Sequence, residues 1–286
     1  MQLTEKQKRN LELQAIEVRQ SIIDMLEDAG SGHTAGSLDM ADIFTALYFH
    51  VAKHDPKNPE WPERDRIILS NGHIVPVRYA TMAHAGYFPI QELKTLRTFG
   101  SRLQGHPERT HLPGLETTSG PLGSGLSQAA GMAYAAKMDK RNHHIFCLMS
   151  DGEMQAGNIW EAAMFAHAHA LDNLIGIVDR NYIQINGRTE DVMPIEPFAE
   201  KWESFGWRVI EINGHRMDAI VEACEAAKAH TGSPVVIIAH TIPGKGVPEI
   251  EFDHEWHGKA PSQEQQDRWL KDLRTLKGKM SASHYE

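Results

Sequence analysis

Two short apolar runs, each followed by a polar turn, constrain the fold of this chain more than any other feature. The first run, Ile145–Met149, leads into Asp151-Gly152, and the second, Leu174–Val178, leads into Asp179-Arg180-Asn181. The alanine-rich segment between them, about 157–170, is typical of a helix. A strand–helix–strand unit predicts two parallel strands, whose carboxyl ends meet at one edge of the sheet. Open α/β sheets bind their ligands at that edge.

The residues in these two turns predict a site for a hard cation that holds a phosphate ester. Asp151 offers a carboxylate, Asn181 an amide oxygen, and the chain after Asn181 a backbone carbonyl. Mg²⁺ prefers such oxygens. Gly152 lets the backbone approach an anion closely, and a nearby helix N-terminus would add donors. A lone Asp-Gly pair is more often only a turn, so the prediction depends on Asn181 at the end of the next strand.

The rest of the chain alternates helical and strand patterns in the same way. Helices are expected over 5–28, 40–51, 75–85, 90–97, from about 126 to 140, and over 196–205, 217–230 and 262–276, and strands over 66–69, 208–212 and 234–239. This alternation predicts an α/β fold with a doubly wound, mostly parallel sheet and helices on both faces. No interdomain linker is visible, so residues 1–286 are expected to form a single domain.

Composition narrows the choice of partners. The 286 residues carry a formal charge of −9 and no long basic run, which argues against a nucleic-acid partner. No apolar stretch approaches the roughly 20 residues of a membrane span, and the polar N-terminus lacks a signal-peptide core. The two cysteines, Cys147 and Cys224, lie in apolar or helical runs, so a reduced, cytoplasmic protein is expected.

Four of the 17 histidines lie in glycine-flanked turns: His33, His73, His106 and His257. One such histidine is usually an ordinary surface residue, but four of them beside predicted strand ends indicate a ligand site. Histidine donates to phosphate and hydroxyl oxygens and transfers protons near neutral pH. The segment 117–126 is rich in small residues and precedes a helix, which favours a binding loop over a flexible connector.

Taken together, these motifs resemble those of transketolases, and they occur in the same order. The matching segments are Ser31-Gly-His33, Leu69-Ser-Asn-Gly-His73, Gly105-His-Pro-Glu108, Thr118-Ser-Gly-Pro-Leu-Gly123, Asp151-Gly152 with Asn181, and His257-Gly258. The resemblance extends nearly end to end but covers only the family's N-terminal, diphosphate-binding domain. The chain therefore looks like the N-terminal subunit of a split transketolase.

The resemblance implies a role for each matching residue. Mg²⁺, with Ca²⁺ or Mn²⁺ as substitutes, would be bound by Asp151, Asn181 and the carbonyl of Ile183. Sugar hydroxyls would be contacted by His33, His106 and His257 as catalytic residues. Thiamine diphosphate would be contacted by His73, Gly120, Pro121, Leu122, Gly152, Glu153, Asn181, Ile183, Ile185 and His257. Glu161 resembles a family glutamate at the dimer interface.

The resemblance also implies a reaction and a partner. Transketolases use thiamine diphosphate to move a two-carbon glycolaldehyde unit from a ketose, often a sugar phosphate, to an aldose. The family's cofactor-activating glutamate and most phosphate-binding arginines lie in a second, pyrimidine-binding domain that does not match this chain. A separate C-terminal subunit is therefore expected, in an α₂β₂ heterotetramer.

Three positions depart from the family pattern. Ser150 stands where a glycine is usual, and Asn186 stands where an aspartate is usual before Gly187. Ala156 replaces a glutamate that joins a carboxylate network between the two active sites of the family. Communication between active sites is therefore expected to be weak or to take another route.

Two other classes of function stay open at this stage. One is a different thiamine-diphosphate enzyme, such as a deoxyxylulose-phosphate synthase or the α subunit of a 2-oxo-acid dehydrogenase, although the histidine turns favour ketose chemistry. The other is a non-catalytic subunit that binds the cofactor and stabilises a partner, which the departures at Ser150 and Ala156 keep open.

Overall fold

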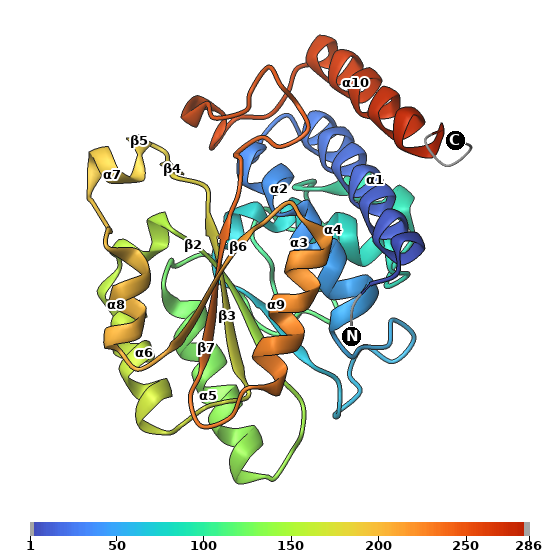
Figure 1. Ribbon diagram of the computed structural model, residues 1–286. Coiled ribbons are helices and arrows are strands. Elements are labelled where there is room, and N and C mark those ends of the chain that lie inside the picture. The colour runs from blue at the N-terminus through green and yellow to red at the C-terminus, as the bar shows by residue number, and fades with distance from the viewer. Residues whose placement is uncertain (1–2, 283–286) are drawn as a thin grey trace.

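The computed structural model describes residues 3–282 and is built around a parallel sheet of five strands (Figure 1). In spatial order the strands are β1 (Arg66–Leu69), β2 (Ile145–Ser150), β3 (Leu174–Arg180), β7 (Val235–His240) and β6 (Arg208–Asn213). A separate antiparallel pair, β4 (Ile183–Gln184) and β5 (Gly187–Arg188), follows β3 directly. Ser150 is in register with Asp179, so the turns after β2 and β3 start at the same edge of the sheet.

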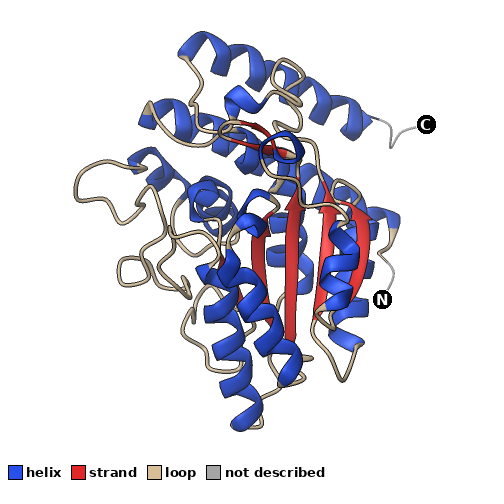
Figure 2. Ribbon diagram, turned by 90° about the vertical axis from the view of Figure 1, so that its left-hand side faces the viewer, coloured by secondary structure: helices blue, strands red, loops and turns tan. Residues whose placement is uncertain are grey.

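Strands β1, β2, β3 and β7 are buried on both faces, as expected when helices cover a parallel sheet on each side (Figure 2), whereas the edge strand β6 is only partly buried. Successive residues of β2 contribute to different cores. Phe146 and Leu148 pack in the core under α1 (Glu5–Ala29), α4 (Val75–His84) and α9 (Met217–Ala229). Cys147 and Met149 pack in the core under α5 (Ser124–Met138), α6 (Gly157–Ala168) and α8 (Phe198–Ser204). The predicted doubly wound fold is confirmed.

Two predicted helices differ from the structure. The segment expected to begin at residue 40 starts earlier, as α2 (Ala35–Asp39) and α3 (Ala41–Ala46), and ends in a π-helical turn, Leu47–Val51. The residues at its start are small, so the sequence there resembles a turn. In the structure they form a helix, in which Ser37 Oγ donates to the His33 carbonyl and all five residues of α2 are buried. The segment expected over 90–97 is a 3₁₀ helix, Ile90–Thr95, which ends before Arg97 at φ +61°.

The remaining helical elements lie around the carboxyl edge of the sheet or, in the case of the last helix, along α1. Short turns of helix occur at Gly72–Ile74, Gly152–Gln155, Thr189–Val192 (α7) and His254–Trp256. The long helix α10 (Gln263–Ala282) lies beside α1 (Figure 1), and Gln266 Nε2 donates to Asp24 Oδ1 at 2.8 Å. The loop between β7 and α10 thereby returns over the N-terminal part of the fold. Within residues 3–282, no helix combines the length and the apolar character needed to cross a membrane.

Candidate active site

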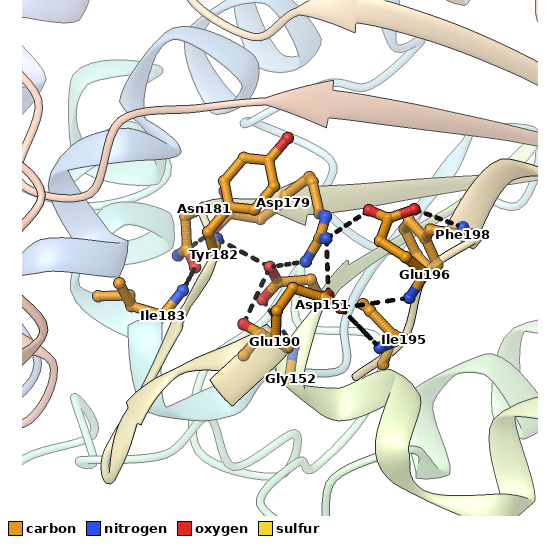
Figure 3. A network of polar contacts seen from close by, with 12 residues as sticks. Asp151, Gly152, Asp179, Asn181, Tyr182, Ile183, Glu190, Ile195, Glu196 and Phe198 are labelled. Carbon is orange, nitrogen blue, oxygen red and sulfur yellow. Dashed lines mark hydrogen bonds and ion pairs between the residues drawn. The ribbon is translucent and has the colours of Figure 1, made fainter. Parts of the chain in front are cut away.

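The turns after β2 and β3 lie against each other, and Asp151 is the acceptor at their centre (Figure 3). Asp151 N donates to the Asp179 carbonyl at 3.0 Å. The Asp151 side chain is fully buried and its Oδ2 accepts from Tyr182 N at 2.8 Å, from Arg180 Nη1 at 2.9 Å and from Thr189 Oγ1 at 3.3 Å. Oδ1 accepts from Gly152 N at 2.7 Å. Burial raises the pKa of Asp151, and the hydrogen bonds from Arg180 and the two amides oppose that shift.

Asn181 lies on the same segment with its amide group held at both ends. Nδ2 donates to Asp39 Oδ2 at 3.0 Å and to Asp179 Oδ2 at 2.9 Å, and Oδ1 accepts from Ile183 N at 3.1 Å. Asp39 comes from α2, 142 residues away in the sequence. We call Asp39, Asp151, Asp179, Arg180 and Asn181 the strand-end cluster.

The oxygen atoms of this region fit the cation expected from the sequence. Asp151 supplies a carboxylate, and Asn181 an amide oxygen. The carbonyl of Ile183 lies 4.0 Å from the position that a Cβ on Gly152 would occupy, so it faces the turn after β2. A carboxylate, an amide and a carbonyl form an all-oxygen donor set, which Mg²⁺, Ca²⁺ and Mn²⁺ accept. No group of three or more His, Cys, Asp or Glu side chains in residues 3–282 is placed to chelate a metal by itself, so such a site needs the carbonyl and the ligand's own oxygens.

Two carboxyl groups, Asp39 and Asp179, lie together behind Asn181 and are almost fully buried, at 0% and 1% exposure. Burial raises the pKa of both, and the repulsion between Asp39 and Asp179 raises the pKa of Asp39 further. The pKa of Asp179 is raised to about 8, so the pair binds at least one proton at neutral pH. Thr241 Oγ1 also donates to Asp179 Oδ1.

Arg180 was not predicted as a functional residue, yet it connects the cluster to the segment after β5. Its guanidinium is 1% exposed and also donates to Glu190 Oε1 at 2.9 Å and Glu196 Oε1 at 2.6 Å. It lies 4.1 Å over the ring of Tyr182, a non-glycine residue at φ +64°. Strained backbone of this kind concentrates at functional sites.

Glu153 joins three of the predicted motifs. Its buried carboxylate accepts from Ser70 Oγ, from Gly123 N and, at 3.2 Å, from Ser150 N. Gly123 is at φ +83°, and a Cβ there would lie 2.0 Å from Asn158 Oδ1, so a side chain at this position would strain the backbone and displace Asn158. The Glu153 carboxylate is therefore occupied within the protein, and it fixes the glycine-rich loop against the ends of β1 and β2.

Three of the four predicted histidines meet in space, although they come from three separate turns. The ring centroids lie 4.8 Å apart for His33 and His73, 5.6 Å for His33 and His257, and 5.2 Å for His73 and His257. We call these three the histidine cluster. His106 lies beside it on an exposed turn, and its Cδ2 is 3.8 Å from the position of a Cβ on Gly120.

The four histidine rings are neutral at pH 7 and have no hydrogen-bond partner in the part of the chain that the structure describes. Burial, the neighbouring His257 and His106, and the Arg97 guanidinium lower the pKa of His33 to about 4. Burial also lowers the pKa of His73, His106 and His257. Within residues 3–282 none of these four rings forms a hydrogen bond, and the buried Nδ1 of His33 has no partner. Neutral rings of this kind can donate to and accept from a polar ligand.

Arg97 is a second residue that sequence analysis missed. Its guanidinium carbon lies 2.9 Å from the position of a Cβ on Gly105, the residue before His106. Arg97 is exposed, and its side chain forms no hydrogen bond or ion pair among the described residues. The positive φ of Arg97, +61°, is the only local feature that sets this residue apart, and a backbone angle cannot be read from the sequence.

The structure does not bring every predicted residue into these clusters. Leu122 is 44% exposed and Ile185 is 69% exposed, and Pro121 and Glu161 are also on the surface. Ser150 is the last residue of β2 and does not have a positive φ, so the serine causes no backbone strain there.

Comparison with known proteins identifies this architecture. Residues 11–278 match the family model "Transketolase, thiamine diphosphate binding domain". The chain belongs to the transketolase family. Relatives of this transketolase chain include a 6-deoxy-6-sulfo-D-fructose transketolase subunit of Clostridium sp. (strain MSTE9), 45% identical over 84% of this chain and 88% of the relative. An apulose-4-phosphate transketolase subunit of Phocaeicola vulgatus is 40% identical over 93% of this chain and 95% of the relative.

Solved transketolases share the fold but are longer. The enzyme of Leishmania mexicana superposes with a TM-score of 0.85 at 31% identity and covers 96% of this chain and 45% of its own. The enzyme of Campylobacter jejuni gives a TM-score of 0.83 at 34% identity, over 95% of this chain and 48% of its own. This transketolase chain thus spans about half the length of these structures. The predicted family, its thiamine-diphosphate-binding domain and transketolase function are confirmed.

Proposed function

We propose that the chain is the thiamine-diphosphate-binding subunit of a two-subunit transketolase and that it is active only with a separate pyrimidine-binding subunit. Two observations support the partner. The chain spans 45% of the Leishmania enzyme but 88% and 95% of two relatives that are named as subunits. In length the chain matches the two relatives that are named as subunits.

The proposed cofactor site is the region between the strand-end cluster and the histidine cluster. Asp151, Asn181 and the carbonyl of Ile183 would bind Mg²⁺, or Ca²⁺ or Mn²⁺ in its place. Gly152, His73 and His257 would contact the diphosphate side of thiamine diphosphate, and the glycine-rich loop and the β4–β5 hairpin would contact its rings. The exposed side chains of Leu122 and Ile185 support this assignment, because a flat apolar ligand or a partner surface would cover them.

Bound thiamine diphosphate would supply the nucleophilic carbon that carries the two-carbon unit between sugars. The chain's own residues would hold the sugar and move protons. His33, His106 and His257 are neutral and lack hydrogen-bond partners within residues 3–282, so each can donate to or accept from a substrate hydroxyl. This is the observation that carries the proposal.

We propose a sugar with an acidic tail as substrate. Two relatives are named for a sulfonated and a phosphorylated sugar, respectively. On this chain, Arg97 is an exposed cation next to His106, and no other described residue pairs with it. Such a guanidinium fits a phosphate or a sulfonate, and it would assist the anion-binding groups expected on the partner.

The proposed α₂β₂ assembly would use the surface of α5 and α6. That surface carries four exposed large hydrophobic residues in addition to Glu161: Tyr134 at 36%, Met138 at 67%, Met164 at 53% and Phe165 at 40%. The rings of Tyr134 and Phe165 lie 5.8 Å apart, so they form one patch. Without the usual glutamate at Ala156, the two active sites of the assembly would communicate weakly. The two buried free cysteines suit a cytoplasmic protein, which we also propose.

Reconstitution tests the proposed function. The purified chain, its candidate partner and the mixture of both are assayed with thiamine diphosphate, Mg²⁺ and phosphorylated or sulfonated ketoses. We expect activity only in the mixture, and loss of that activity in His257→Ala. Full turnover by this chain alone would refute the two-subunit proposal. A mixture that is indifferent to His257→Ala would show that the chain is a non-catalytic subunit.

A further inference from the structure

The orientation of the Asn181 amide is determined by two carboxyl groups that no sequence motif assigns. Both hydrogens of Nδ2 are used, one by Asp39 Oδ2 at 3.0 Å and one by Asp179 Oδ2 at 2.9 Å. The amide oxygen is left on the other side, where it accepts from Ile183 N at 3.1 Å. A carbonyl oxygen accepts two hydrogen bonds or ligands, so one lone pair of Oδ1 stays open.

The opposite orientation of the amide is excluded by the same contacts. A rotation by 180° would place Oδ1 against two carboxyl oxygens and the NH₂ group against the Ile183 N–H. A carboxyl proton could restore only part of these contacts, the NH₂ group would face the Ile183 N–H, and the three hydrogen bonds of the present orientation would be lost. A cation placed beside Asp151 would then face an NH₂ group instead of an oxygen.

We propose that Asp39 and Asp179 are positioning residues for the metal site, because they hold the Asn181 oxygen toward the cation. The inference rests on the proposed function, since it requires that Asn181 bind the metal. Groups that orient metal ligands in this way commonly change metal affinity by about 10–100-fold when they are replaced.

Asp39 also links the proposed metal site to His33, because α2 begins directly after the turn that carries His33. Ser37 Oγ donates to the His33 carbonyl, so this turn and α2 are held together. The Asp39–Asn181 hydrogen bond therefore connects the substrate-facing His33 to the metal-facing Asn181 through five buried residues, Ala35–Asp39. Asp179 is itself held by Thr241 on the segment after β7.

The test is an isosteric double variant, Asp39→Asn with Asp179→Asn. Each new amide can present either an oxygen or an NH₂ group to Asn181, so the amide of Asn181 loses its preferred orientation while the packing volume is kept. Binding of Mn²⁺ in the presence of thiamine diphosphate is measured by electron paramagnetic resonance on the full chain, with and without its partner subunit. We expect the dissociation constant for Mn²⁺ to rise about 10–100-fold.

Asp42→Asn is the matched control. Asp42 is also a buried aspartate, three positions from Asp39 on the next helix, but it pairs with Arg19 at 2.6 Å and His215 at 2.8 Å instead of Asn181. Its replacement removes a buried carboxylate and should leave the Mn²⁺ affinity within about threefold of wild type, because independent sites act additively.

A double-mutant cycle separates positioning from simple charge loss. In an Asn181→Ala background, the two substitutions should cause no further loss of Mn²⁺ affinity. An equal loss in both backgrounds would overturn the proposal, because the carboxyl groups would then act through their charge. Unchanged affinity in the double variant would overturn it as well.

Two further measurements keep the outcome decisive. If the melting curve shows that the double variant is unfolded, Asp39→Asn and Asp179→Asn are tested singly, and each should still raise the dissociation constant by about threefold or more. Singles with wild-type affinity would overturn the proposal. A wild-type chain that binds no Mn²⁺ even with cofactor and partner would refute the proposed cofactor site, whereas wild-type binding with indifferent variants refutes only the positioning role.

Discussion

The strand-end cluster and the histidine cluster differ in how much of their hydrogen-bonding capacity the protein itself uses. In the strand-end cluster Asp151 accepts from four donors, and Arg180 donates to three carboxylates. In the histidine cluster no ring nitrogen has a protein partner among residues 3–282. Groups that the protein already pairs contribute to folding and hold the proposed metal ligands in a rigid frame, whereas the unpartnered rings are left for a substrate. Substitutions in the strand-end cluster are therefore expected to lower stability in addition to metal binding, whereas substitutions in the histidine cluster are expected to lower mainly activity.

The largest expected effect is on turnover, in the histidine cluster. His257→Asn should lower turnover of the reconstituted enzyme by about 10²–10⁴-fold, the usual contribution of a positioned proton donor or acceptor. The unfolding free energy should change little, since the ring has no hydrogen bond to lose. Steady-state kinetics and urea unfolding of the same preparation check both statements. A large loss of stability with normal turnover would reverse the contrast between the clusters.

The next effect is on stability, in the strand-end cluster. Asp151→Ala leaves the Arg180 guanidinium, which is 1% exposed, without its buried partner. Because Arg180 keeps its pairs with Glu190 and Glu196, the unfolding free energy of the cofactor-free chain should fall by about 1–3 kcal/mol, the usual cost of leaving buried hydrogen-bonding groups unsatisfied. Urea unfolding measures this change.

Glu63→Ala is the control for that measurement. Glu63 pairs with Arg141 at the surface, where the side chains are 41% and 49% exposed. Its removal should cost about 0–1 kcal/mol. Equal losses in the two variants would mean that the Asp151–Arg180 pair adds no more stability than a surface pair.

A smaller effect concerns pH. The pKa of His33 is about 4 in the folded chain, against an ordinary value of 6.5, so the fold favours the neutral ring. The resulting stability is fully present above pH 6.5 and is lost as the pH falls toward 4. The full shift corresponds to about 3 kcal/mol, and partial exposure of the ring reduces this to roughly 1–2 kcal/mol.

His33→Asn should flatten the dependence of the unfolding free energy on pH between 6.5 and 4. Thermal melts of wild type and variant at several pH values across this interval provide the measurement. Parallel curves for the two proteins would show that the histidine cluster does not favour the neutral ring.

The smallest effect is expected at Ser150, where the family usually has glycine. Ser150 is extended as the last residue of β2, so glycine gains nothing from its freedom at positive φ. Ser150→Gly should lower the unfolding free energy by about 0.5–1 kcal/mol and leave cofactor affinity unchanged. A clear gain in cofactor affinity would instead mark the serine as a functional impairment.

The layered α/β fold and most of the candidate site could be predicted from the sequence alone. The apolar runs at 66–69, 145–149, 174–178 and 234–239 are fully or largely buried strands, and periodicity of this kind is a local property. The glycine-flanked histidines and the pair Asp151 and Asn181 were visible because each lies in a short motif beside a strand end. Their mutual approach follows from the parallel sheet, which aligns those ends.

The groups that surround these motifs, in contrast, could be identified only in the folded chain. Asp39 reaches Asn181 across 142 positions, and Arg180 contacts Glu190 and Glu196 through the hairpin that follows β3. Arg97, at φ +61°, has its guanidinium carbon 2.9 Å from the position of a Cβ on Gly105, next to His106. These contacts depend on packing between elements far apart in the chain, where neither spacing nor periodicity carries information. The ligand motifs are thus a local property of the sequence. The groups that orient the motif residues, or place a charge beside them, are brought there only by the assembled fold.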